Sequence, residues 1–236
     1  MSGESAVRDG AEASVKLDEQ TDQGPDYQLI ETMRWEPLSG VLRLDLHMAR
    51  LEGSANELGF DCDMMAIRQK IEAAGTSDQA LKLRLTLAPD GLSEIIATPF
   101  EPLPQNTVWR IAIASTRLRH DDPLLRHKTT RRRAYIAARE EYSLAEVDEV
   151  ILLNERDELC EGTITSIFLD TGDATFATPA LSSGLLDGVL RREILNNGIA
   201  TETPVSVKDL KKARTILVGN SLRGMIRAKL IDIDKI

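Results

Sequence analysis

Lys128 is the residue of this chain whose neighbours most clearly suggest chemistry. It lies in the segment HKTTRRRAY (127–135), with Arg126 before it and Arg131 after it. A lysine amine has a pKa of about 10.4 and is therefore protonated, and not nucleophilic, at neutral pH. Neighbouring cations and burial both disfavour the charged form and lower that pKa. The charge run alone leaves three interpretations open: a solvated helix face, an anion-binding patch, or an amine able to form a Schiff base.

The positive charge around this lysine is local, because the chain as a whole is acidic. Its formal net charge is −9, whereas residues 117–133 hold seven basic and two acidic residues. Proteins that bind single-stranded nucleic acid interleave aromatic and basic side chains, and only 4% of this chain is aromatic. The surrounding negative charge would also repel a polyanion. We therefore expect no nucleic-acid partner.

Two other stretches could serve a ligand. Glu161 stands between two predicted strands, where a carboxylate is either a turn residue or a partner for a positive group. Gly184 and Gly188 bracket a loop that runs directly into the predicted helix GVLRREILNNG (188–198). The first amides of a helix have no intrahelical partner and suit a phosphate. Neither stretch is specific by itself.

Taken together and in order, six motifs of this chain resemble those of the class IV (fold-type IV) aminotransferases. That family uses pyridoxal 5′-phosphate and includes branched-chain aminotransferases, D-amino acid aminotransferases and 4-amino-4-deoxychorismate lyases. The resemblance covers roughly residues 27–224. The motifs are ETMR (31–34), HMARLEGSANELGF (47–60), HKTTRRRAY (127–135), EGTITSIF (161–168), TPALSSGLLDGVLR (178–191) and VGNSLRG (218–224).

The resemblance implies a role for each matching residue. Lys128 resembles the lysine that holds the cofactor as a Schiff base and then moves the α-proton. Glu161 matches the carboxylate at the pyridine nitrogen, whose charge makes the ring an electron sink. Arg50 is similar to the arginine that binds the cofactor phosphate. The other phosphate contacts implied are the amides of Gly188, Val189 and Leu190, together with Asn220 and Ser221. No metal site is expected.

The resemblance leaves the reaction open. We favour transfer of an amino group between an amino acid and a 2-oxo acid, and the alternative is an aminodeoxychorismate lyase that releases pyruvate and 4-aminobenzoate. Thr32 falls where the lyases have a threonine thought to assist proton transfer, which favours the lyase. Arg84 and Arg223 are candidates for binding a substrate carboxylate. A third alternative is a degenerate member of the family that binds without catalysis.

Two departures from the family pattern concern the site itself. Branched-chain enzymes carry a tyrosine five residues after the lysine, near the phenolic oxygen of the cofactor. Here that position is Arg133, and Tyr135 follows at seven, so the role of Tyr135 stays open. The loop before the predicted helix has Asp187 where a proline is frequent and Leu190 where a hydroxyl often stands, which leaves a phosphate more dependent on backbone amides.

The elements that must position these residues can be predicted from periodicity and turn signals. Residues 27–34 predict a strand, and the apolar spacing from Leu44 to Leu58 predicts a helix that Asp45 caps and Gly59 ends. The stretch LKLRLTLAPDGLSEIIA (81–97) predicts a hairpin. We also expect a helix from about Thr129. The further predicted elements are a helix before Gly75 and strands at 108–115, 149–154, 163–170, 174–179 and 214–220.

These elements predict an α+β or α/β protein in two parts. A small two-layer α/β domain is expected over 27–118, and a larger β-rich, barrel-like domain with the cofactor lysine over 119–236. Residues 1–26 carry seven acidic and two basic residues and almost no large apolar ones, so we expect a disordered tail.

Composition restricts the location of the protein. The chain has no apolar run of about 20 residues, no basic or apolar start, and two cysteines without CxxC spacing. We therefore expect a cytoplasmic protein with no membrane contact. The family resemblance also implies a homodimer that acts on a small-molecule amino acid, oxo acid or aminodeoxychorismate.

Overall fold

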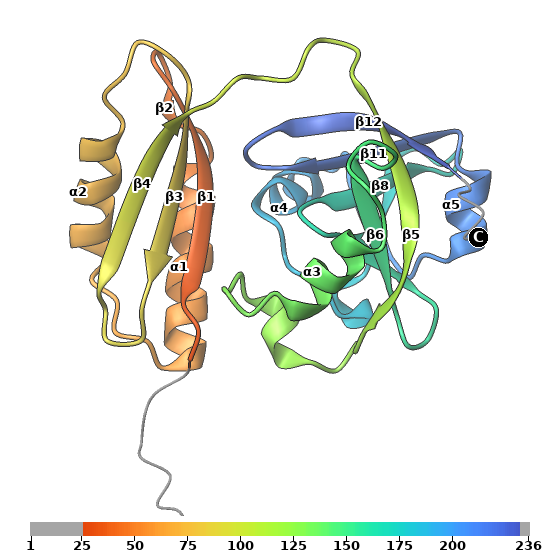
Figure 1. Ribbon diagram of the computed structural model, residues 1–236, viewed down its shortest axis with the longest axis horizontal. Coiled ribbons are helices and arrows are strands. Elements are labelled where there is room, and N and C mark those ends of the chain that lie inside the picture. Colours follow the sequence, from red (N-terminus) through yellow and green to blue (C-terminus); the bar gives the residue numbers. More distant parts are fainter. Residues whose placement is uncertain (1–25, 232–236) are drawn as a thin grey trace, which may run out of the picture.

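The computed structural model describes residues 26–231, which form two β-sheets with helices packed against them (Figure 1). The expected tail lies outside the described residues except for Asp26. The first sheet has the order β2-β1-β3-β4 and the second the order β10-β9-β8-β11-β12-β5-β6-β7. This mixed α+β architecture agrees with the predicted fold class. Among the described residues, no helix is both long enough and apolar enough to span a membrane.

The first sheet and its helices come from the N-terminal part of the described chain. Their bounds are β1 (Leu29–Glu36), β2 (Gly40–Val41), α1 (Leu44–Leu58), α2 (Met64–Ala74), β3 (Leu81–Leu87) and β4 (Ser93–Pro99). The second sheet and its helices comprise β5 (Val108–Leu118), α3 (Arg133–Glu140), β6 (Glu149–Asn154), β7 (Leu159–Gly162), β8 (Ser166–Asp170), β9 (Phe176–Pro179), α4 (Val189–Asn196), β10 (Ala200–Thr203), α5 (Val207–Lys212), β11 (Thr215–Asn220) and β12 (Gly224–Leu230).

Alternation along β1 and β3 separates two faces of the first sheet. Leu29 and Met33 on β1, with Leu83 on β3, are buried in the core that the sheet shares with α1 and α2. Because successive side chains of a strand point to opposite faces, Thr32 and Arg84 lie on the other face, where they are paired across the two strands. That second face is the one that can contact a ligand between the sheets.

The helix α1 begins differently from the sequence-based expectation. Asp45 does not cap it; the Asp45 carboxylate pairs with Arg68 of α2 at 2.9 Å, and the residue before the helix is Arg43, in a left-handed conformation with φ 60°. The end is as expected, since Gly59 has φ 71° and its amide bonds to the carbonyl of Ala55. Asp63 and Gly75 bound α2 as the sequence predicts.

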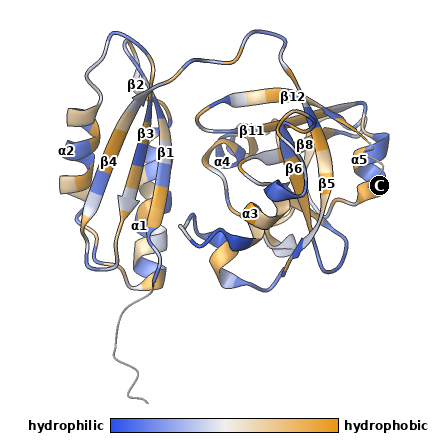
Figure 2. Ribbon diagram, viewed as in Figure 1, coloured by the Kyte–Doolittle hydropathy of each residue, from blue (hydrophilic) through white to orange (hydrophobic). Residues whose placement is uncertain are grey.

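The second sheet takes the strand that the sequence analysis grouped with the first. β5 pairs in parallel with β6 and β12, and its buried residue Ile111 packs in the same core as Ile151 and Val218. Residues 108–115 were expected to belong with the first sheet, and they pair in the second. Local periodicity does not report long-range strand order, which is why the expectation differed. The domain boundary at 118/119 stays a prediction. Figure 2 shows apolar strands inside this unit and a strongly hydrophilic segment before α3 that faces the first sheet.

That hydrophilic segment carries Lys128 and is extended, not helical as expected from Thr129 onward. Thr129 forms an antiparallel bridge with Leu29, and the amide of Ile30 donates to the Lys128 carbonyl at 2.8 Å. β2 pairs only with the end of β1, so the start of β1 has an open edge that this segment fills. The backbone hydrogen bonds of this pairing outweigh the local helix propensity, and α3 begins only at Arg133.

Candidate active site

One cavity of about 750 Å³ lies between the two sheets. This volume is within the range of pockets that hold small ligands. Every candidate residue of the sequence analysis lines it. Those residues are Thr32, Arg50, Arg84, Lys128, Glu161, Gly188, Val189, Leu190, Asn220, Ser221 and Arg223.

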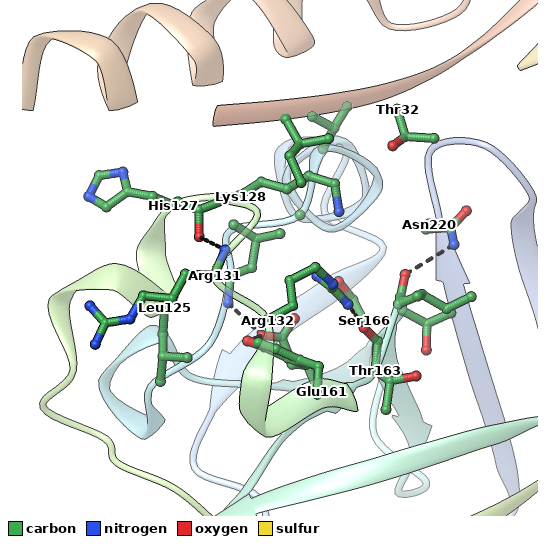
Figure 3. Close-up of a pocket in the computed structure, with 18 of the residues that line it drawn as sticks. Thr32, Leu125, His127, Lys128, Arg131, Arg132, Glu161, Thr163, Ser166 and Asn220 are labelled. Carbon is green, nitrogen blue, oxygen red and sulfur yellow. Dashed lines mark hydrogen bonds between the residues drawn. The ribbon is translucent and has the colours of Figure 1, made fainter. Parts of the chain in front are cut away.

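Lys128 extends into the cavity from the strand-like segment beside β1 (Figure 3). His127 points to the opposite side, as alternation requires, and its Nδ1 bonds to Ser54 Oγ at 2.9 Å. Burial, and then the positive charges of Arg50 and Arg132, lower the pKa of the Lys128 amine from 10.5 to about 8. A substantial fraction of the amine is therefore neutral, and nucleophilic, near physiological pH.

Glu161 stands at the end of β7, deep in the cavity wall. Its Oε1 accepts hydrogen bonds from the Tyr135 hydroxyl at 2.7 Å and from the Leu186 amide at 3.0 Å. Burial raises the pKa of Glu161 to about 7, although these two hydrogen bonds and the charge of Lys128 act in the opposite direction. Glu161 can therefore be charged at neutral pH, and more readily when a positive group approaches it.

The start of α4 forms another part of the wall. The helix begins at Val189 after Gly188, and no side chain caps its first amides. A Cβ atom on Gly188 would come within 2.8 Å of the Ser166 hydroxyl, so a larger residue would close the approach to those amides. Asp187 is turned away, because its carboxylate binds Arg191 at 3.3 Å and Arg192 at 2.9 Å. This helix start is open to an anion.

A buried hydrogen-bond network joins α1 to β1 and to the turn after β11. Arg50 donates two hydrogen bonds to Glu31, at 2.7 and 2.8 Å, and His47 Nδ1 lies 2.6 Å from the same carboxylate. His47 Nε2 in turn lies 2.7 Å from Ser221 Oγ. Burial alone would raise the pKa of Glu31, but Arg50 and His47 lower it to about 2. Glu31 therefore stays charged and holds Arg50 at the cavity edge.

A third buried carboxylate, that of Glu149, organises the turn that follows Glu161. It accepts hydrogen bonds from the amide and hydroxyl of Thr163, at 3.0 and 2.6 Å, from the Ile164 amide at 3.1 Å, and from the Thr165 hydroxyl at 2.8 Å. The Ile164 carbonyl then accepts a hydrogen bond from the Asn220 side chain at 3.0 Å. The side chain of Asn220 thus uses one of its two N–H donors within the protein, and its second donor and its backbone can contact a ligand.

The cavity carries a large excess of positive charge. Among the described residues, no ion pair joins Arg84, Arg131, Arg133 or Arg223 to a carboxylate. Arg223 stacks over Trp109, with the guanidinium 5.9 Å from the ring centroid, and burial lowers its pKa. The basic lining residues are Arg50, Lys82, Arg84, Arg117, Arg119, Lys128, Arg131, Arg132, Arg133 and Arg223, and the acidic ones are Asp122 and Glu161.

Four residues that shape this site were not predicted from the sequence. Glu31 and His47 lie inside two of the quoted motifs, and their signals were a carboxylate on the apolar face of a strand and a histidine one helical turn before Arg50. Glu149 gave no comparable signal, and Arg132 lies in the basic run of the motif 127–135, where nothing distinguishes it from its neighbours. Arg132 lines the cavity, donates a hydrogen bond to the Thr163 carbonyl and stacks over the ring of Tyr135.

Comparisons with known proteins agree with this geometry. Residues 28–231 match the family model described as "Amino-transferase class IV". A Schizosaccharomyces pombe protein named "Putative aminodeoxychorismate lyase" is 27% identical over 212 residues, which cover 87% of this chain and 90% of that protein. A Thermotoga maritima protein named "Probable branched-chain-amino-acid aminotransferase" is 28% identical over 196 residues, 80% of this chain and 68% of that protein. A solved structure from Mesorhizobium loti, described as a "Putative amino-acid aminotransferase", is 52% identical, with a TM-score of 0.85, and the match covers 87% of this chain and all 100% of that one.

Proposed function

The chain belongs to the class IV aminotransferase family, and from this premise we propose that it is a pyridoxal-phosphate enzyme that eliminates pyruvate from an amino substrate of the aminodeoxychorismate type. Members of this family are enzymes, and they use pyridoxal 5′-phosphate. The specific reaction and the roles of individual residues are the parts we propose. The observation that carries the choice of substrate is the surplus of unpaired cations in the cavity.

The residues present fit pyridoxal phosphate. Arg50, the uncapped start of α4 and the space that Gly188 leaves beside Ser166 would hold its phosphate. Lys128, with its lowered pKa, would bind the aldehyde carbon covalently. The Glu161 carboxylate would face the ring nitrogen. The phosphate dianion would thus face Arg50 and the α4 amides, the electrophilic aldehyde carbon would face the Lys128 amine, and the pyridine nitrogen would face the Glu161 carboxylate.

Lys128 would act twice in the proposed reaction. A neutral amine is needed for covalent binding, and the same nitrogen, once released, takes the proton from the substrate carbon that bears the amino group. Thr32 lies on the cavity face of β1, where its hydroxyl can assist that transfer. Bound pyridoxal phosphate supplies an electron-poor ring that stabilises the negative charge left on that carbon.

The elimination balances without an oxidant. The C–H bond at the amino-bearing carbon breaks, and then the C–O bond to the enolpyruvyl group breaks. The proton and the oxygen leave with pyruvate, and the six-membered ring becomes aromatic as 4-aminobenzoate. In this proposal Lys128 is the proton acceptor, and Glu161 supplies the negative charge opposite the pyridine nitrogen of the cofactor.

The cation surplus supports a substrate with more than one carboxylate. Arg50 and the α4 amides would bind the cofactor phosphate, and Arg84, Arg131, Arg133 and Arg223 would then have no anion from the described chain. Cations that converge on a cavity raise the local concentration of anionic ligands. The aminodeoxychorismate skeleton carries two carboxylates, whereas an aliphatic amino donor carries one and would also need an apolar pocket for its side chain. A dicarboxylic amino acceptor such as 2-oxoglutarate shares the two carboxylates, so the paired assays below decide between the two reactions.

Transamination is the second candidate, because the 52% identical Mesorhizobium loti structure is described as an aminotransferase. The two reactions share proton removal by Lys128 and differ afterwards. A transaminase would release a keto acid and pass the amino group to a second substrate, whereas a lyase would expel pyruvate. A homodimer and a cytoplasmic location remain proposals that follow from family resemblance and from composition.

The test supplies purified protein, loaded with pyridoxal phosphate, with aminodeoxychorismate in one assay and with amino acids plus 2-oxoglutarate in another. Equal amounts of pyruvate and 4-aminobenzoate in the first assay, without amino exchange in the second, are expected. Amino exchange without pyruvate release would overturn the lyase proposal in favour of transamination.

Lys128→Ala is the control for both assays and should be inactive in each. Borohydride reduction followed by peptide mapping should place the pyridoxyl group on Lys128 in the wild type. Failure to find that adduct would support the non-catalytic alternative instead.

A further inference from the structure

Tyr135 contacts Glu161, the carboxylate proposed to face the ring nitrogen of the cofactor. It lies in the first turn of α3, and its hydroxyl donates to Glu161 Oε1 at 2.7 Å. The Leu186 amide donates to the same oxygen at 3.0 Å. No hydrogen bond from the described residues reaches Oε2 of Glu161. The protein thus holds one oxygen of the carboxylate with two donors and leaves the other for a ligand.

The direction of the Tyr135 hydroxyl is itself fixed by packing. The Arg132 guanidinium lies 4.7 Å from the centroid of the tyrosine ring, and the same guanidinium donates to the Thr163 carbonyl. The ring also packs against the core cluster that includes Ala138 and Leu152. A stacked cation together with apolar packing restricts the orientation of an aromatic ring.

We propose that Tyr135 is a positioning residue for Glu161. The Tyr135 hydroxyl holds Oε1 of the carboxylate, so that Oε2 would be left for the ring nitrogen of pyridoxal phosphate. This inference rests on the proposed role of Glu161. It also assigns a role to the tyrosine that stands two residues beyond the position where the branched-chain enzymes carry theirs. In this chain the Tyr135 hydroxyl donates its hydrogen bond to Glu161.

The electrostatics of the pair agree with this role. Burial raises the pKa of Glu161 to about 7, and the Tyr135 hydrogen bond is the first of the effects that oppose burial. Burial also raises the pKa of Tyr135 well above its usual value, so the hydroxyl remains a donor throughout the neutral range. Removing this donor leaves burial less opposed, so the pKa of Glu161 rises further. At neutral pH more of the carboxyl would then be neutral and unable to pair with a protonated ring nitrogen.

The test compares Tyr135→Phe with Tyr142→Phe. The Tyr142 hydroxyl donates to the Ile113 carbonyl at 2.7 Å, so this control loses one hydrogen bond of equal length outside the cavity. The dissociation constant of pyridoxal phosphate is measured from its absorbance between about pH 6 and about pH 9. Tyr135→Phe should weaken binding about tenfold at neutral pH, the usual loss for one hydrogen bond to a charged group. The ratio to wild type should shrink as pH rises, because Glu161 becomes charged in both proteins.

Glu161→Gln separates failure of this inference from failure of the premise. If Glu161→Gln binds the cofactor like wild type at every pH, the proposed role of Glu161 is wrong. If Glu161→Gln weakens binding but Tyr135→Phe behaves like Tyr142→Phe, the positioning role of Tyr135 is overturned. A purely structural tyrosine would lower the unfolding temperature of the cofactor-free protein and leave the pH dependence of binding unchanged.

A second variant covers the case in which Tyr135→Phe does not fold. 3-Fluorotyrosine, incorporated into a protein that also carries Tyr27→Phe and Tyr142→Phe, keeps the ring and makes residue 135 a stronger donor. Stronger donation should lower the pKa of Glu161, so cofactor binding should persist to lower pH than in the same double variant with ordinary tyrosine. An unchanged pH profile would count against the proposal.

Discussion

Lys128→Met should stabilise the cofactor-free protein, because the native lysine costs folding free energy. Burial, Arg50 and Arg132 lower the pKa of Lys128 from 10.5 to about 8. At about 1.36 kcal/mol per pKa unit, holding the protonated amine in the folded protein costs about 3 kcal/mol. Methionine has a similar length and no charge, so it removes this cost. Urea unfolding of the cofactor-free variant at pH 7 should show a gain of about 3 kcal/mol.

The pH dependence of this gain has a definite sign. Well below pH 8 the amine is protonated in both the folded and the unfolded protein, and the folded state carries the full cost. Above pH 10.5 it is neutral in both states and the cost disappears. The advantage of Lys128→Met should therefore be complete at neutral pH and fade between about 8 and 10.5.

The matched control is Lys229→Met on β12, where the lysine is exposed and no comparable gain is expected. Both proteins must be freed of pyridoxal phosphate, since a ligand that binds only the folded wild type would stabilise it and mask the effect. If Lys128→Met is no more stable than wild type at pH 7, the amine is not desolvated and the argument for its reactivity fails.

Three further perturbations test the surrounding shell. Burial would raise the pKa of Glu31, but Arg50 and His47 lower it from 4.5 to about 2. Glu31→Gln should therefore reduce the free energy of unfolding in urea by about 3 kcal/mol at pH 7. That difference should be present above pH 4.5 and shrink as the pH falls toward 2. Glu149→Gln leaves at least one donor of the following turn unsatisfied, so it should cost about 2 kcal/mol and speed hydrogen exchange at the Ile164 amide. Arg223→Gln should raise KM for a doubly carboxylated substrate about tenfold and leave KM for a monocarboxylic amino donor unchanged.

The candidate residues of the cavity could be predicted from the sequence because they lie in short motifs with a fixed order. Lys128, Glu161 and Arg50 come from three distant segments and line one cavity in the structure. Most predicted strands and helices also occur near the expected bounds, since alternation and helical spacing report which face is buried. Among the described residues, β2, β7, β10, α5 and β12 were not predicted. Strands of two to four residues, such as β2, β7 and β10, give too few alternations to be recognised.

The errors arose where long-range pairing outweighs local preference. Thr129 belongs to a run with high helix propensity, yet it pairs with Leu29 at an open strand edge. The helix therefore begins at Arg133, which moves Tyr135 to its first turn and toward Glu161. Arg133 and Tyr135 both lie in the first turn of α3, and only Tyr135 contacts Glu161. No local pattern in the chain could have predicted this contact.

The unpredicted partners of Arg50 illustrate the same limit. Glu31 is one of three buried residues that begin β1, and its position says only that its side chain faces α1. That His47 and Arg50 would meet it there depends on the packing of the helix on the sheet. A carboxylate on an apolar strand face is a sign of a buried ion pair, since an unpaired charge would be too costly there, but the sign does not identify the partner.

The attachment of the Lys128 segment to β1 has a consequence for how this scaffold could be given new substrates. The amide of Ile30 donates a backbone hydrogen bond to the carbonyl of Lys128, so Lys128 has a fixed register relative to β1. Thr32 lies on the same strand, and Arg84 is paired with Thr32 on the neighbouring strand β3. Neighbouring strands are spaced about 4.8 Å apart whatever their side chains. Under the proposed roles, substitutions at positions 32 and 84 would change substrate selectivity, while the spacing between Lys128 and these strand positions would stay constant.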